Sequence, residues 1–268
     1  MNIVERNFYK LLRAGAYGTE EQIEPLSAWK WNRLYQLSMM HAVAHILYKG
    51  IEHCQDQFFV QVPKATLELW SQADNNDDSE GYDLLMSNRL TNPLLNHRLQ
   101  DILDSEDSNI ETRTALLHLV GIARFIMNAG IPVKRATEFG CFLREKNSYI
   151  DFMKLKEWTK SLEIDAMVQI TAILLVKLLH FVPEELPFMQ PTTDDKMERQ
   201  VREMLRQKNS HAEQWYFEQG KNIFVHTSNS QAMLWHVRRS AKFFKYYPAE
   251  TLTNFITSFA HSLSHIEE

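Results

Sequence analysis

The stretch Ile164–Phe181, IDAMVQITAILLVKLLHF, is the most apolar run of the sequence. Its apolar residues recur every three or four positions, which is the period of one face of a helix. Polar residues interrupt the run at Asp165, Gln169 and Lys177, so it falls short of the roughly 20 apolar residues that a membrane span needs. The run therefore predicts a helix buried in a protein core.

The composition of the whole chain favours the same class of structure. Glycine and proline number only 8 each among 268 residues, about half their usual share, which leaves few tight turns for a many-stranded sheet. Hydrophobic residues make up 44% of the chain, enough for a sizeable core. We predict an all-α, multi-helical array in which an N-terminal helical segment packs on a larger C-terminal helical part.

Cysteine usage and the first residues indicate the compartment. Cys54 and Cys141 are the only two cysteines, so no disulfide framework holds the fold. Residues 1–18 contain four charged side chains and lack the uninterrupted apolar stretch of a secretory signal. These features predict a cytoplasmic protein, for which we expect no cofactor and no metal site.

Hydrophobic periodicity divides the chain into five parts. The predicted parts are an N-terminal helical segment (1–75), an acidic seam without apolar period (76–92), a helical core (93–182), a proline-rich connector (183–193) and C-terminal helices (194–268). The seam is the only long stretch with the composition of a loop. It is therefore the predicted boundary between the two helical parts.

Capping residues predict where individual helices begin. Ser108 with Glu111 three residues later forms a capping-box pattern ahead of a strongly apolar run. Asp151 is the expected N-cap of the helix that follows it. Pro248 is expected to open the last helix of the chain, since proline suits the first helical turn.

A resemblance to a known family is carried mainly by four blocks of sequence. They are FYKLLRAGAYG (8–18), AWKWNRLYQLSMMHAVAHILYKGI (28–51), LLHLVGIARFIMNAGIPVKRATEFGCFLREKNSYIDFMKLKEWTKSLEIDAM (116–167) and FFKYYPAETLTNFITSF (243–259). In order and spacing they resemble the helical flanks of a family of uncharacterised bacterial nucleotidyltransferases. In that family the flanks enclose a mixed sheet with a glycine turn and two aspartates one residue apart. Such a pair holds Mg²⁺ against nucleotide phosphates.

The catalytic centre of that family is missing from this chain. The family's helix ends near Trp70, and the next similar block, NRLTNPLLNHRLQDIL, begins at Asn88. The resemblance therefore implies a non-catalytic, nucleotidyltransferase-like helical protein that acts as a protein-binding or regulatory module. The alternative is an enzyme of that class whose site is rebuilt from seam residues such as Asp77 and Asp78, or is completed by another chain.

A further alternative rests on Arg113 and His118, which form the Arg-x4-His spacing of certain helical nucleases. Acid–base catalysis would require both side chains in a wet cleft. The four residues between them, Thr-Ala-Leu-Leu, are largely apolar. The competing interpretation therefore places His118 in the core and Arg113 at its rim.

Charge is distributed unevenly along the chain, whose formal net charge is −5. Residues 71–111 contain ten acidic and two basic side chains, whereas residues 196–245 contain ten basic and four acidic ones. The candidate binding cluster of the basic segment is Arg238, Arg239, Lys242 and Lys245. Such a cluster can bind phosphates, but we favour docking on an acidic protein surface, within the chain or in a second copy. The predicted partner is an unknown protein or the chain itself, rather than nucleic acid or a membrane.

Overall fold

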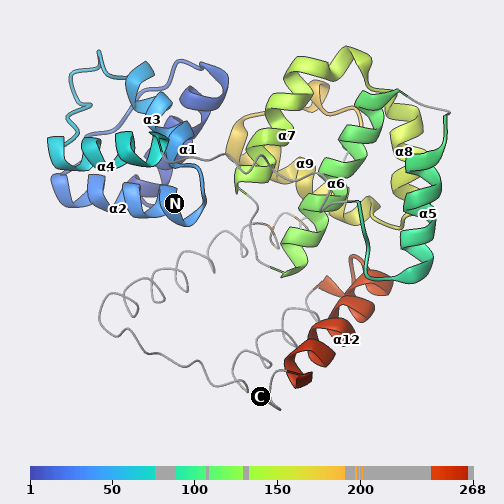
Figure 1. The fold of residues 1–268 in the computed structure, drawn as a ribbon. Coiled ribbons are helices and arrows are strands. Elements are labelled where there is room, and N and C mark those ends of the chain that lie inside the picture. The colour runs from blue at the N-terminus through green and yellow to red at the C-terminus, as the bar shows by residue number, and fades with distance from the viewer. Residues whose placement is uncertain are drawn as a thin grey trace. The chain divides into compact units, whose positions relative to one another are not determined.

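The computed structural model of the chain describes residues 1–75, 88–106, 109–128, 133–190, 197, 199, 201 and 243–264. These residues form ten α-helices and two short 3-10 helices, and no strand occurs among them (Figure 1). In chain order the elements are α1 (Ile3–Tyr17), α2 (Ala28–Met40), α3 (Ala44–His53), α4 (Lys64–Asn75), α5 (Pro93–Asp104), α6 (Ile110–Asn128), α7 (Val133–Lys146), η2 (Asn147–Tyr149), α8 (Phe152–Ser161), α9 (Asp165–Leu179), η3 (Pro183–Glu185) and α12 (Pro248–Ser264). The prediction of an all-α, multi-helical array is confirmed.

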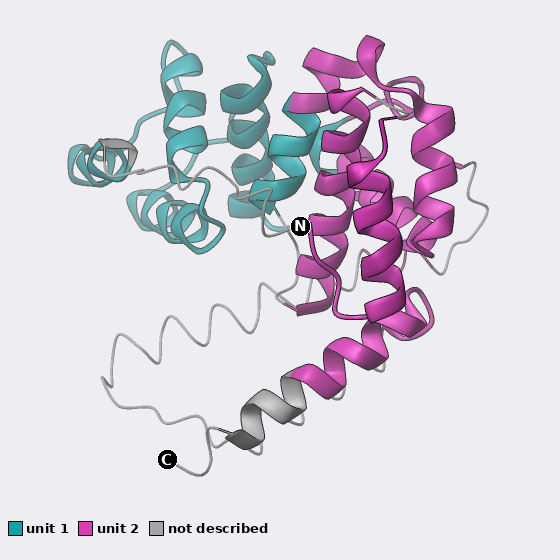
Figure 2. Ribbon diagram, turned by 45° about the vertical axis from the view of Figure 1, so that its right-hand side comes forward, with its two compact units in different colours: residues 1–82, 133–141, 177–180 teal, residues 83–132, 142–176, 181–268 magenta. Residues whose placement is uncertain are grey.

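The chain divides into two compact units (Figure 2). Unit 1 comprises residues 1–82, 133–141 and 177–180, and unit 2 comprises residues 83–132, 142–176 and 181–268. Unit 1 therefore takes parts of α7 and α9 in addition to the N-terminal helices. Most of the predicted seam, residues 76–87, and most of the helices predicted between residues 194 and 242 lie outside the described residues.

Unit 1 is built around a close crossing of α1 and α3. A Cβ atom placed on Gly15 would collide with the carbonyl oxygen of Ile46 and lie 2.7 Å from the backbone nitrogen of Gly50. A Cβ atom on Gly50 would collide in turn with the carbonyl oxygen of Leu11. Both glycines are therefore required because backbone meets backbone at this point, and backbone cannot move aside as a side chain can.

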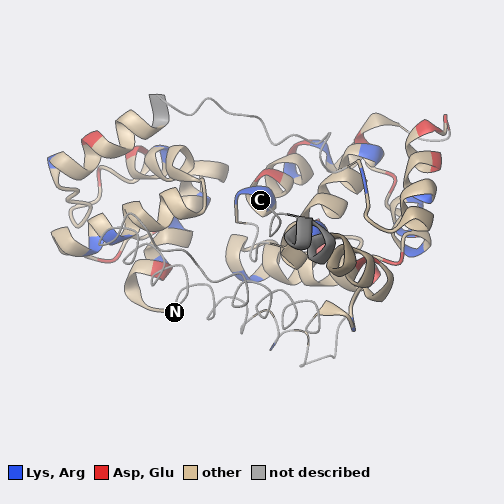
Figure 3. Cartoon of the chain, turned by 60° about the horizontal axis from the view of Figure 1, so that its bottom comes forward, with Lys and Arg blue, Asp and Glu red and all other residues tan. Residues whose placement is uncertain are grey.

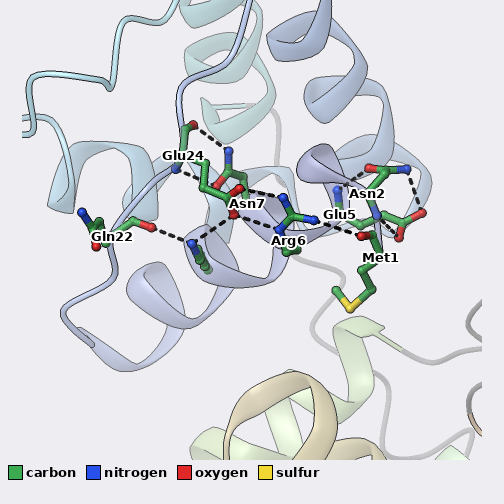
Figure 4. Close-up of polar contacts among 8 residues, drawn as sticks. Met1, Asn2, Glu5, Arg6, Asn7, Gln22 and Glu24 are labelled. Carbon is green, nitrogen blue, oxygen red and sulfur yellow. Dashed lines mark hydrogen bonds and ion pairs between the residues drawn. The ribbon is translucent and has the colours of Figure 1, made fainter.

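The loop that follows α1 is held against that helix by Glu24 (Figure 4). Arg6 donates to both carboxylate oxygens of Glu24, at 2.9 and 2.7 Å, and Lys10 Nζ lies 3.2 Å from one of them. The Arg6 guanidinium and then Lys10 lower the pKa of Glu24 to about 2. Asn7 adds two hydrogen bonds to the backbone of Glu24. The loop thus follows α1 along a row of polar contacts.

Helix α9 is the buried helix that the apolar run predicts. Nine consecutive residues, 167–175, are buried, so the helix is enclosed on all its faces over that length. Gln169 donates to the carbonyl of Phe188 at 3.0 Å and accepts from the backbone N–H of Gln190 at 2.8 Å. The polar interruption in the sequence therefore fixes the segment that follows η3.

The two predicted N-caps have different outcomes. Asp151 accepts a hydrogen bond from the backbone N–H three residues later, at 3.0 Å, which confirms it as the cap of α8. The capping box predicted at Ser108 is wrong, because Asn109 accepts from the N–H of Thr112 at 2.9 Å and α6 begins one residue later than expected. Ser108 itself lies outside the described residues. The shift moves Glu111 away from the third helical position that a capping box needs.

Candidate functional site

Most of the charged candidates from the sequence lie outside the described residues. These are Asp77 and Asp78 of the seam and Arg238, Arg239 and Lys242 of the basic cluster. Lys245 is described, is exposed, and places its Nζ 5.7 Å from the centroid of the Tyr246 ring. Metal binding at the seam and docking of the basic cluster therefore stay predictions.

Arg113 and His118 are both described, and both lie on α6 in unit 2. Arg113 Nη2 donates to the carbonyl oxygen of Ser105. His118 is only 6% exposed, and its ring centroid lies 5.2 Å from that of Phe142. Burial lowers the pKa of His118 to about 4, so its imidazole is neutral at pH 7. The described geometry places His118 in the core rather than in a wet cleft with Arg113.

Groups of three or more His, Cys, Asp or Glu side chains able to hold a metal ion are absent from the part of the chain that the structure describes. In that same part, no helix combines the length and the apolar character needed to cross a bilayer. Cys54 is buried, and this burial raises the pKa of its thiol. Cys54 is therefore a core thiol.

Helix α12 is held in unit 2 by a buried carboxylate. Glu250, in its first turn, is fully buried, and its two carboxylate oxygens accept from the backbone N–H groups of Thr91 at 2.7 Å and Asn92 at 2.8 Å. These amides directly precede α5, so the carboxylate lies at the positive end of that helix dipole. A charge-assisted pair of hydrogen bonds thus joins the start of α12 to the start of α5.

Two further polar contacts join α12 to the end of α6. Thr251, which is 2% exposed, donates to the sulfur of Met127 at 3.5 Å. Asn254 donates to the side-chain oxygen of Asn128 at 2.7 Å. The side chains that bond the start of α12 to α5 and α6 are therefore the polar Glu250, Thr251 and Asn254.

Two large apolar residues of α12, Leu252 and Ile256, lie on its outer side. Leu252 is 51% exposed and Ile256 is 56% exposed. Residues four apart share one face of a helix, and these two lie on the side roughly opposite Glu250 and Thr251. In Figures 1 and 2, α12 meets the rest of unit 2 at its first turns and extends away from it. Surface helices ordinarily have the reverse arrangement, with the apolar side inward.

The outer face of α12, defined by Leu252 and Ile256, is free of charge. The run Thr251–Ser264 contains no Asp, Glu, Lys or Arg, and the part of α12 that is not grey in Figure 3 carries no Lys or Arg. The sequence predicts this helix but assigns no site to it. The spacing of Leu252 and Ile256 within a charge-free run could have indicated an apolar side of the helix. The spacing does not indicate which side of the helix meets the core.

No family model, curated protein or solved structure matches this chain. The resemblance to nucleotidyltransferase flanks accordingly rests on the quoted sequence blocks and stays a prediction.

Proposed function

We propose that this chain is a non-catalytic helical protein that binds another protein chain through the outer face of α12. The observation that supports the proposal is the inverted orientation of that helix, with Glu250 fully buried while Leu252 and Ile256 are more than half exposed. Single exposed apolar residues are ordinary on protein surfaces. A helix that buries its first-turn carboxylate and exposes two apolar side chains one turn apart is not.

The hydrophobic effect favours binding of a partner over the outer face of α12. Removing apolar surface from water is worth about 25 cal/mol per Å². Because hydrogen bonds of Glu250 and Asn254 already fix α12, a partner would meet a face that is ordered in advance. Association then loses little conformational entropy in ordering the helix.

A photo-crosslinking amino acid at position 252, in the full chain expressed in cells, tests this proposal. We expect irradiation to give a discrete adduct that migrates above the 31.5 kDa chain. The matched control is position 257, since Thr257 is also exposed on α12 but lies about 140° around the helix from Leu252.

The proposal requires a difference between the two positions. If position 252 gives no adduct, or if positions 252 and 257 give the same adducts in equal yield, the outer face of α12 is not a binding surface. A Leu252→Glu variant should keep the melting temperature of the natural chain, because an exposed substitution away from special features changes stability by only about 0.5 kcal/mol.

A further inference from the structure

We infer that the partner of the outer face of α12 is a second copy of this chain, with the two α12 helices packed antiparallel about a two-fold axis. This inference rests on the proposed function, because it names the occupant of the same face. Three observations support it: the absence of charge on the face, the spacing of its apolar residues, and the symmetry that such a face allows.

The charge pattern favours a copy over other occupants. The chain carries a net charge of −5, yet Thr251–Ser264 contains no charged side chain. Two copies can therefore bring these faces together without like charges opposing each other. An anionic lipid surface or a nucleic acid would find no Lys or Arg on this helix to bind, and the net negative chain would repel it.

The spacing of apolar residues reads the same in both directions. The sequence continues the spacing of Leu252 and Ile256 with apolar residues at positions 259 and 263, so that the intervals are four, three and four residues, the period of one helix side. An antiparallel pair whose axis passes between positions 257 and 258 places position 252 opposite 263, and 256 opposite 259. Every apolar position of one copy then meets an apolar position of the other.

The shape of α12 suits this pairing. Its 17 residues give a rod of about 26 Å that extends from unit 2. Antiparallel helices oppose their dipoles favourably, and the commonest homo-oligomer is a two-fold dimer built from one self-complementary patch. The uncharged Thr253 lies beside Ile256 on the helix, so this edge of the interface carries no repulsive charge either.

Light scattering after size exclusion tests the inference on the full chain. At about 100 µM protein we expect a mass near twice 31.5 kDa, falling toward 31.5 kDa on dilution, because a contact limited to one helix per copy is at the small end of interfaces. Ile256→Glu should keep a mass near 31.5 kDa at every concentration, with the melting temperature unchanged. Thr257→Glu, which adds the same charge to an exposed position away from the face, should remain dimeric.

A charge-swap mixture makes the test specific for self-pairing. Ile256→Glu and Ile256→Lys should each be monomeric alone, and mixing them should restore the dimer in a salt-sensitive manner, because the two positions lie next to the axis. A chain that is monomeric at about 100 µM overturns the inference. The proposed function survives that result if position 252 still crosslinks to a different protein. Both fail if the natural chain is monomeric and Ile256→Glu unfolds it, since the face is then covered by its own chain.

Discussion

Helices α1 and α12 both carry apolar residues on one side, but they direct that side differently. In α1, Leu11 and Leu12 are fully buried in unit 1, and Gly15 lets α3 approach to backbone contact. In α12, Leu252 is 51% exposed while Glu250 is fully buried. The comparison shows that hydrophobic periodicity identifies the two sides of a helix. Specific contacts then determine which side faces inward.

The two regions also differ in what stabilises them. The crossing of α1 and α3 depends on shape, because two glycines remove the atoms that would otherwise keep the helices apart. The start of α12 depends on polar groups, since Glu250 satisfies two backbone N–H groups at the start of α5. Substitutions at the two places should therefore fail for different reasons and by different amounts.

The largest effect is expected at the α1–α3 crossing. Gly50→Ala should lower the free energy of unfolding by more than about 3 kcal/mol, because the added methyl group would collide with the carbonyl oxygen of Leu11. Helix propensity alone would favour alanine by about 1 kcal/mol, so the sign of the change is diagnostic. Urea unfolding provides the measurement. Exposed Glu52→Ala on the same helix is the control, and a neutral or stabilising Gly50→Ala would show that the crossing is not tight.

In unit 2, apolar residues pack closely around His118. The dependence of the unfolding free energy on pH tests whether this packing excludes a charged imidazole. The folded pKa of about 4 lies below the ordinary 6.5, so the unfolded chain takes up the proton first as the pH falls. The contribution of His118 to the free energy of unfolding is complete above pH 6.5. This contribution should fall by about 3 kcal/mol when the pH is lowered to 4.

The variant His118→Gln isolates this contribution from all other titrating groups. The loss of unfolding free energy between pH 7 and pH 4 should be about 3 kcal/mol smaller in the variant than in the natural chain. Met153→Gln, at an exposed position of unit 2 that does not titrate, is the control and should lose as much unfolding free energy as the natural chain. Equal losses in His118→Gln and in the natural chain would contradict the buried, neutral state of His118.

A smaller effect is expected at the start of α12. Glu250→Gln keeps the shape of the side chain but turns an amide N–H₂ toward N–H donors, so we expect a loss of about 2 kcal/mol. The same urea titration measures it, with exposed Glu157→Gln as control. If Glu250→Gln changed the free energy of unfolding no more than its control does, the hydrogen bonds of Glu250 would not stabilise α12. The contrast with the α1–α3 crossing would then disappear.

Local patterns predict more of the helices than of the contacts between them. The buried run of α9 and the cap at Asp151 follow from residues within a few positions of one another, and both are confirmed. The cap at Ser108 was placed one residue too early, because the neighbouring Asn109 is an equally good capping residue. Such errors of one position are typical of helix boundaries.

The features that determine the candidate site depend on partners far along the chain. Glu250 looks in sequence like an ordinary acidic residue of a first helical turn, and only Thr91 and Asn92 explain its burial. The requirement for glycine at positions 15 and 50 likewise appears only when α1 and α3 meet. Neither the inward polar side of α12 nor its exposed outer face could therefore be predicted from periodicity.

The bonds between Glu250 and the start of α5 also place a condition on the timing of folding during synthesis. Thr91 and Asn92 are translated 159 and 158 residues before the carboxylate that they bind. At about 5 to 20 residues per second, a ribosome needs roughly 8 to 30 seconds to cover that interval. During this time water must serve those two amides, while α5 relies on its own Asn92 side chain, which accepts from Leu94 and Leu95. The start of α5 therefore cannot form its hydrogen bonds with Glu250 until the first turn of α12 has been synthesised.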